Sequence, residues 1–206
     1  MTRFVLRSLI VIGISGFLAS TAQAAGDPVA GRAKFDACVG CHSIPGWTNV
    51  YPTYHVPRLG GQHADYVVAA LRAYQAGERR HPSMYANSNI LSEQDMQNIA
   101  AFVAEAQATE RPSPVRGNVA AGQVKSETCV ACHGPDGNSP ITLYPRLDGQ
   151  HEDYLRRTLQ EYQSGARVNA IMNGIAAPLS AQDIADLSAY FASQSDGLTV
   201  VRKGSN

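Results

Sequence analysis

The sequence predicts an all-α protein made of two similar domains in tandem. Two observations lead to this prediction. Most of the chain repeats itself once, and its apolar residues recur at helical spacing behind helix-capping residues. We find no convincing segment in which apolar and polar residues alternate as they do in a β-strand. A chain of 206 residues, 44% hydrophobic and 17% charged, has the composition of a globular protein and the length for two small domains.

The first residues have the pattern of a secretory signal peptide. Arg3 and Arg7 precede an uncharged apolar run, and Ala22-Gln23-Ala24 has the small-x-small pattern of a cleavage site. The run from Ser8 to Leu18 is shorter than the ~20 residues that a membrane-spanning helix needs, which makes an anchor the weaker alternative. We therefore expect residues 1–24 to be removed and the protein to be soluble in the periplasm.

The charge of the remaining chain excludes some kinds of partner. The whole sequence has 17 basic and 17 acidic residues, and loss of Arg3 and Arg7 leaves 15 and 17, a net charge of −2. Proteins that bind nucleic acid or anionic membrane surfaces usually carry an excess of basic residues. We therefore expect no nucleic-acid partner.

The internal repeat divides the chain. Gly26–His42 (GDPVAGRAKFDACVGCH) matches Gly117–His133 (GNVAAGQVKSETCVACH) at an offset of 91. Pro57–Gly77 (PRLGGQHADYVVAALRAYQAG) matches Pro145–Gly165 (PRLDGQHEDYLRRTLQEYQSG) at an offset of 88. A polar, Pro-rich segment separates the copies, so we predict an N-terminal domain over 25–108, a linker over 109–116 and a C-terminal domain over 117–206. A residue shared by both copies is a better functional candidate than one present in a single copy.

Capping residues and apolar spacing predict the helices. Asp27-Pro28 predicts the start of a helix that runs into the first cysteine pair. Apolar residues at helical spacing predict a second helix from Gln62 to Gln75. Ser92 with Asp95, and Ser180 with Asp183, have the spacing of capping boxes. They predict final helices from Ser92 to about Ala108 and from Ser180 to about Ser193.

All four cysteines lie in two Cys-x-x-Cys-His motifs. These are Cys38-Val39-Gly40-Cys41-His42 and Cys129-Val130-Ala131-Cys132-His133. The pattern is typical of covalent haem c attachment, because two thiols one helical turn apart can bond to one haem edge and the next histidine can reach the iron. A thioredoxin-type dithiol needs a βαβ context, a zinc site needs both repeats to converge, and disulfides leave both histidines unexplained. We therefore predict two haem c groups, with His42 and His133 as iron ligands.

Methionine is the usual second axial ligand in cytochromes c. Met84 and Met172 are equivalent in the repeat, and we predict that they ligate the first and second iron. Met96 corresponds to Ile184, which favours a core position. His63 and His151 are also equivalent; ligation by them is the alternative, and a capping or surface role is the simpler interpretation.

Other shared residues suggest supporting roles. Arg58 and Arg146, and Arg79 and Arg167, recur in both copies, either as ligands of haem propionates or as solvated surface charges. A backbone carbonyl near Pro57 and Pro145 is a candidate acceptor for the ring N–H of the ligand histidine.

These motifs together resemble the dihaem cytochrome c4 family over nearly the whole chain after residue 24. The resemblance implies two class I cytochrome c folds related by a pseudo-two-fold axis, with haem propionates facing each other at the domain interface. It also implies electron transfer in the periplasm, often to terminal oxidases, and peripheral membrane association in some members. The longer loop over residues 43–56, which contains Trp47, departs from the pattern; it either covers a haem edge or forms a partner surface.

We predict an electron carrier without a small-molecule substrate, not an enzyme. Two irons with His and Met ligands have no open position for a substrate. The expected partners are redox proteins such as a terminal oxidase or a dehydrogenase. Two alternatives stay open at this point: the cytochrome subunit of a dehydrogenase complex and, less favoured because both halves carry an equivalent methionine, a dihaem peroxidase.

Overall fold

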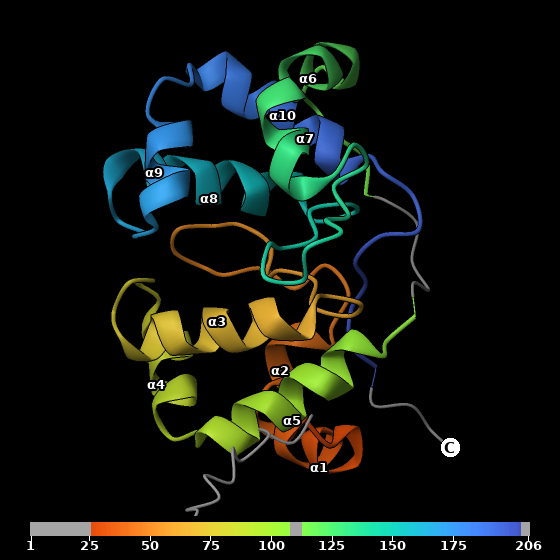
Figure 1. The fold of residues 1–206 in the computed structure, drawn as a ribbon, viewed down its shortest axis with the longest axis vertical. Helices are drawn as coiled ribbons and strands as arrows, with labels where there is room; N and C mark the ends of the chain where they lie inside the picture. The colour runs from red at the N-terminus through yellow and green to blue at the C-terminus, as the bar shows by residue number, and fades with distance from the viewer. Residues whose placement is uncertain (1–25, 108–112, 203–206) are drawn as a thin grey trace, which may run out of the picture.

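The computed structural model describes residues 26–107 and 113–202, and within these ranges the fold is helical. Two groups of helices stack along the long axis of the molecule, α1 to α5 in one group and α6 to α10 in the other (Figure 1). The described residues form no named β-strand, and three isolated β-bridges occur. The all-α, two-domain prediction is confirmed. The predicted signal peptide, residues 1–24, and residues 109–112 of the predicted linker lie outside the described ranges.

The two domains contain corresponding helices. The N-terminal domain has α1 (Pro28–Lys34), a 3-10 turn (Phe35–Ala37), α2 (Val39–His42), α3 (Ala64–Gln75), α4 (Pro82–Asn89) and α5 (Glu93–Ala104). The C-terminal domain has α6 (Val119–Lys125), α7 (Glu127–His133), α8 (Glu152–Ser164), α9 (Ala170–Ala176) and α10 (Ala181–Ala192).

Local sequence signals predicted four of these helices, α1, α3, α5 and α10, near their observed positions. Both predicted capping boxes are present: Ser92 and Asp95 begin α5, and Ser180 and Asp183 begin α10. The helix predicted from Asp27 ends at Lys34 and continues as a 3-10 turn, so it does not run unbroken into the cysteines. Helix α5 ends at Ala104, four residues before the predicted end. Helices α4 and α9 had no prediction.

The first and last helices of each domain cross at a glycine. Helix α1 packs on α5, and α6 packs on α10. A Cβ atom on Gly31 would lie 1.9 Å from the Asn98 carbonyl oxygen, and one on Gly122 would lie 2.0 Å from that of Asp186. Both distances are far below van der Waals contact, so any larger residue would push the helices apart.

The same crossing carries a polar contact that differs between the domains. Asn98 Oδ1 accepts a hydrogen bond from the backbone N–H of Asp27 at 2.9 Å. At the equivalent position, Asp186 accepts from the backbone N–H of Asn118 and from Lys125 Nζ, at 3.2 and 2.6 Å. The hydrogen bond from Lys125 is the main reason why the pKa of Asp186 lies below its usual value. The C-terminal domain therefore has a titratable group where the N-terminal domain has a neutral amide.

Asp186→Asn is expected to make the stability of the C-terminal domain less sensitive to acid. A carboxylate whose folded pKa is lowered stabilises the fold above its unfolded pKa, about 3.9, and this contribution is lost as the pH falls through the folded pKa. The unfolding free energy of the unmodified protein should therefore fall more steeply than that of the variant below about pH 5. Urea unfolding at pH 7, 5 and 3 measures the difference. Parallel pH profiles for the two proteins would contradict the expectation.

Two separate apolar cores lie in the two domains. The N-terminal core includes Phe35, Val67, Met96 and Val103, which confirms a core position for Met96. The C-terminal core includes Leu155 and Tyr190–Ala192. One fully buried member of the N-terminal core, Val201, comes from beyond the last helix. Thr199 and Val201, predicted as part of the C-terminal domain, contact the N-terminal domain. The predicted domain boundaries stay a prediction.

Reciprocal glutamine contacts join the domains. Gln62 Oε1 accepts from the backbone N–H of Arg146 at 2.8 Å, and its Nε2 donates to the Arg146 carbonyl at 3.1 Å. Gln150 makes the same pair of bonds with Arg58, both at 2.9 Å. Each domain thus satisfies a backbone donor and acceptor of the other in the same way. This exchange is what a pseudo-two-fold axis between the domains requires.

Candidate functional sites

Each Cys-x-x-Cys-His motif lies on a short helix. Cys38 caps the N-terminus of α2, and His42 ends it; Cys129, Cys132 and His133 lie in α7. The four cysteines form no disulfide. Burial raises the pKa of Cys38 to about 11, with a further contribution from Cys41, and it also raises the pKa of Cys129. Each motif thus presents two thiols that form no disulfide and lie about one helical turn apart.

A backbone carbonyl fixes each motif histidine. His42 Nδ1 donates to the Pro57 carbonyl at 3.0 Å, and His133 Nδ1 donates to the Pro145 carbonyl at 3.1 Å. These bonds confirm the carbonyl acceptor that the shared Pro-Arg-Leu segment suggested. Burial lowers the pKa of His42 to about 4 and lowers that of His133 as well. Each ring is therefore neutral at pH 7 and keeps Nε2 for a metal, the tautomer that an iron ligand needs.

The two predicted methionine ligands lie on two helices, α4 and α9, that the sequence analysis did not predict. Met84 and Met172 occupy the third position of α4 and α9, and both are half-buried. The residue that caps each helix holds the methionine backbone: His81 Nδ1 accepts from Met84 N at 3.3 Å, and Asn169 Oδ1 accepts from Met172 N at 3.0 Å. His81 and Asn169 occupy equivalent positions of the repeat and differ in residue type, yet both cap the helix that carries the methionine. The signals that could have revealed these helices are Pro82 at a first helical position and Asn169 at an N-cap.

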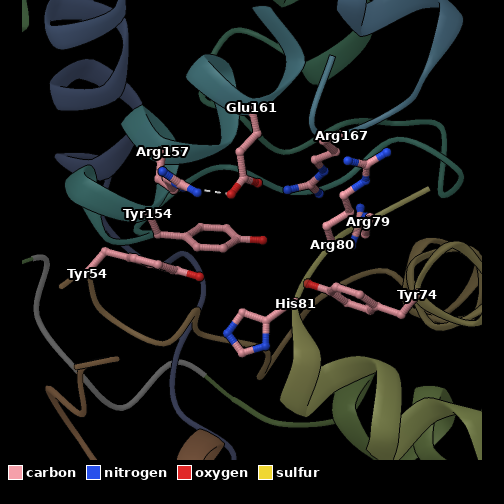
Figure 2. Close-up of a pocket in the computed structure, with 9 residues that line it drawn as sticks. All are labelled: Tyr54, Tyr74, Arg79, Arg80, His81, Tyr154, Arg157, Glu161 and Arg167. Carbon is pink, nitrogen blue, oxygen red and sulfur yellow. Dashed lines mark hydrogen bonds and ion pairs between the residues drawn. The ribbon is translucent and has the colours of Figure 1, made fainter. Parts of the chain in front are cut away.

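Buried arginines gather between the domains (Figure 2). Arg79 and Arg167 face each other in an isolated β-bridge and are 9% and 3% exposed, so the solvated-surface interpretation of this pair was wrong. Both donate to the Tyr66 hydroxyl, at 2.6 and 3.2 Å. Burial alone would raise the pKa of Tyr66, but the two guanidinium groups hold it below its usual value.

The arginine pair has more positive charge than the nearby protein neutralises. Within the described ranges, no carboxylate forms an ion pair with Arg79 or Arg167. Arg167 Nε is buried without a hydrogen-bond partner. Arg79 and Arg167 line a small cavity together with Arg80, Arg157 and five other residues, of which only Glu161 is acidic. Buried cations normally need an anion, so this site fits the propionates of a haem.

Arg58 and Arg146 are also interdomain residues. Arg58 Nη1 donates to the Gly149 carbonyl at 2.6 Å, and Arg146 Nη1 donates to the Gly61 carbonyl at 3.1 Å. Arg146 also forms an ion pair with Asp148 at 2.5 Å. These contacts place both side chains against the opposite domain. Neither is a solvated surface charge, which was one of the two interpretations offered by the sequence.

The alternative histidines do not cap their helices. The side chains of His63 and His151 make no capping hydrogen bond, and the preceding Gln62 and Gln150 accept their backbone N–H groups instead. His151 is 4% exposed and stacks on His55 with ring centroids 4.5 Å apart. His55 in turn donates to Asp153 at 2.7 Å. Both the capping and the surface interpretation of His151 were therefore wrong.

The long loop over residues 43–56 has two parts. Its base, Tyr54 and His55, contacts Tyr154, His151 and Asp153 of the C-terminal domain. Its tip is exposed, with Val50 and Tyr51 at 89% and 97%. The base thus belongs to the domain interface, a role that the sequence did not indicate.

A metal ion held by protein side chains alone needs several ligand residues around it. Within the described ranges, no group of three or more His, Cys, Asp or Glu side chains is placed to hold an ion. The residues that are present fit a haem: paired free thiols, a neutral histidine with one nitrogen available, and unneutralised cations at the interface. The described helices also include none that is long and apolar enough to cross a membrane.

The fold and the two sites define a two-domain c-type cytochrome with one covalent haem in each domain. The family model for cytochrome c matches residues 28–107 and again residues 119–195. The cytochrome c4 of Thiocapsa roseopersicina is 32% identical over 188 residues, which cover 83% of this chain and 94% of that protein. The chain therefore belongs to the cytochrome c family, and within it to the dihaem cytochromes c4.

Other comparisons agree with this assignment. The cytochrome c4 of Pseudomonas aeruginosa is 50% identical over 78 residues, a match that spans 38% of this chain and 39% of that protein. The solved cytochrome c4 of Acidithiobacillus ferrooxidans is 29% identical with a TM-score of 0.68, over 77% of this chain and 99% of that one. A thiosulfate dehydrogenase electron acceptor of Stutzerimonas stutzeri is 29% identical over 76% of this chain and 78% of that protein. The chain is thus a dihaem electron-transfer cytochrome whose partners are redox proteins, as predicted.

Proposed function

We propose that this chain carries single electrons between redox proteins of the periplasm through two haems with His and Met ligands. Cys38 and Cys41 attach the first haem, and His42 and Met84 ligate its iron. In the C-terminal domain, Cys129 and Cys132 attach the second haem, and His133 and Met172 ligate its iron. The observation that carries the proposal is the repetition, in both domains, of a carbonyl-fixed neutral histidine and a capped helix that bears a half-buried methionine.

The residues around each site set conditions for fast electron transfer. When bound, the haem iron supplies the one-electron Fe(III)/Fe(II) couple, and a Met ligand raises its potential. The Pro57 and Pro145 carbonyls keep each histidine ring in one orientation in both redox states. The caps at His81 and Asn169 hold the methionine backbone in place. Little rearrangement of the protein then accompanies the transfer.

We assign the interface arginines to the haem propionates. Arg79 and Arg167 lie between the domains with their charge unneutralised by carboxylates in the described ranges. Their fork of N–H donors matches a carboxylate in shape and charge. A positive charge beside a haem disfavours Fe(III), so these arginines raise the potential.

Arg167→Met is expected to lower at least one haem midpoint potential. The substitution removes a buried positive charge, which favours Fe(III), and a shift of ~60 mV corresponds to a tenfold change in the one-electron equilibrium. Arg157→Met is the matched control, because Arg157 lines the same cavity but its side chain is 41% exposed and paired with Glu161. A potentiometric titration of the three proteins makes the comparison. Equal shifts in both variants would contradict the assignment.

A dehydrogenase is the electron donor that the comparisons favour. A relative of this chain is named as the electron acceptor of thiosulfate dehydrogenase. A terminal oxidase is the other candidate partner. In both arrangements this chain relays electrons and performs no chemistry on the substrate, so we propose that it is not itself an enzyme. Reduction of the purified protein by a thiosulfate dehydrogenase, with thiosulfate as the electron source, tests the first partner.

The visible spectrum tests the proposed ligation. We expect two haems per chain and a near-red Met–Fe(III) band at the strength of two such sites. A ratio of two with the band at half strength would remove either Met84 or Met172 from the ligand set. Binding of carbon monoxide to the reduced protein at neutral pH would then favour the peroxidase alternative.

A further inference from the structure

The last described residues leave their own domain and enter the other one. Beyond α10 the chain runs from the C-terminal domain to the N-terminal domain (Figure 1). Leu198 N still donates to the Asp148 carbonyl of the C-terminal domain at 2.8 Å. Thr199 then pairs with Gly60 of the N-terminal domain, with N–H to O=C distances of 3.0 and 2.8 Å in the two directions. We call residues 198–201 the crossing segment.

The end of the crossing segment packs in the core that supports the first haem motif. Val201 is 0% exposed and belongs to the N-terminal core, against which Cys38 and Val39 of the first haem motif also pack. Its backbone N–H donates to the carbonyl of His42 at 3.4 Å. The crossing segment therefore contacts both the core behind the haem motif and the backbone of the predicted iron ligand.

The crossing segment bonds to equivalent residues of the two domains, because Thr199 N donates to the Gly60 carbonyl and Leu198 N donates to the Asp148 carbonyl. Gly60 corresponds to Asp148, so the Pro-Arg-Leu-Gly-Gly segment becomes Pro-Arg-Leu-Asp-Gly in the second copy. A Cβ atom on Gly60 would lie 2.7 Å from Thr199 Cγ2 and 3.0 Å from the Thr199 carbonyl oxygen. The first copy thus lacks a side chain at the point where the crossing segment passes.

We propose that the crossing segment is a positioning element for the first haem, so that residues from the C-terminal end of the chain set the potential of the N-terminal site. Val201 excludes water from the core beside Cys38, and its N–H orients the carbonyl of His42. Without it, water reaches the haem surroundings, and a more polar environment favours Fe(III) over Fe(II). The proposal rests on the proposed ligation of the first haem by His42.

Two variants and one matched control test this proposal. The first variant, Val201→Ala, shortens the buried side chain. The second variant is a chain shortened to end at Val200, which lacks Val201 but keeps the pairing of Thr199 with Gly60. Leu198→Ala is the control: Leu198 is also buried and in the same segment, but its backbone bonds to the C-terminal domain. Potentiometric titration gives the two midpoints of each protein. Separate Met84→His and Met172→His variants identify which midpoint belongs to which haem.

We expect the first-haem midpoint to fall in Val201→Ala, to fall further in the shortened chain, and to stay unchanged in Leu198→Ala. The second-haem midpoint should stay unchanged in both Val201 variants. The proposal is overturned if the shortened chain keeps both midpoints, or if both midpoints move together. The proposed ligation fails separately, in the unmodified protein, if that protein lacks two haems or the full near-red band.

Discussion

Replacing Met84 with His is expected to remove half of the near-red Met–Fe(III) absorption and to lower one of the two midpoint potentials strongly. The axial ligand is the main determinant of haem potential, over a range of about 0.8 V, and exchange of Met for His removes the ligand that favours Fe(II). Met172→His should have the same effect on the other midpoint. Spectroscopy and potentiometry of both variants measure these changes.

Met96→Leu is the matched control for Met84→His. Met96 lies in the same domain but is 3% exposed and belongs to the apolar core. A volume-conserving exchange there should cost less than about 1.5 kcal/mol of stability and leave the near-red band at full strength. Loss of the band in Met96→Leu, with its retention in Met84→His, would reverse the ligand assignment.

Gln150→Ala is expected to destabilise the domain interface by about 2–6 kcal/mol. Gln150 is 5% exposed, and its side chain pairs with both the N–H and the carbonyl of Arg58. Each buried backbone group left without a partner costs about 1–3 kcal/mol. The loss is a large part of the free energy of unfolding of a typical protein, which is about 5–15 kcal/mol. We therefore expect the two domains to unfold in separate transitions. Calorimetry measures this directly.

Two further variants show whether the effect comes from the interface. Gln62→Ala should behave like Gln150→Ala, because Gln62 makes the reciprocal contacts with Arg146. Gln163→Ala should cost less than about 1 kcal/mol, because Gln163 is exposed and its side chain bonds to carbonyls of its own domain. A single cooperative transition in Gln150→Ala would show that the glutamine pairs do not hold the domains together.

Features that depend on local sequence were predicted well. The haem motifs, the two capping boxes and the carbonyl acceptors for His42 and His133 all depend on residues near each other in the chain, and the repeat marks them twice. Helices α4 and α9 were missed because they are short, and α4 also has little apolar periodicity. The start residues His81 and Asn169 differ in type, so comparison of the copies hid their common role as caps.

Features that depend on contacts between the domains were not predicted. The sequence showed that Arg79 and Arg167 recur, but it could not show that they meet at one tyrosine of the N-terminal domain. It also did not show that Gln62 and Gln150 bond to the opposite domain, because a repeat aligns equivalent residues without placing them relative to each other. The loop over residues 43–56 was expected to cover a haem edge or to form a partner surface, and the sequence did not show that its base touches the C-terminal domain.

The crossing segment also has a consequence for the order in which the protein folds. Domains of a multidomain chain generally fold as units, and the N-terminal one usually folds first as the chain is made. Here the N-terminal core lacks Val201 until the residues that follow α10 have been synthesised. The first domain therefore cannot reach its final packing while the chain is still emerging. The C-terminal domain, whose described core residues lie between 115 and 192, can complete its own core before the N-terminal domain does.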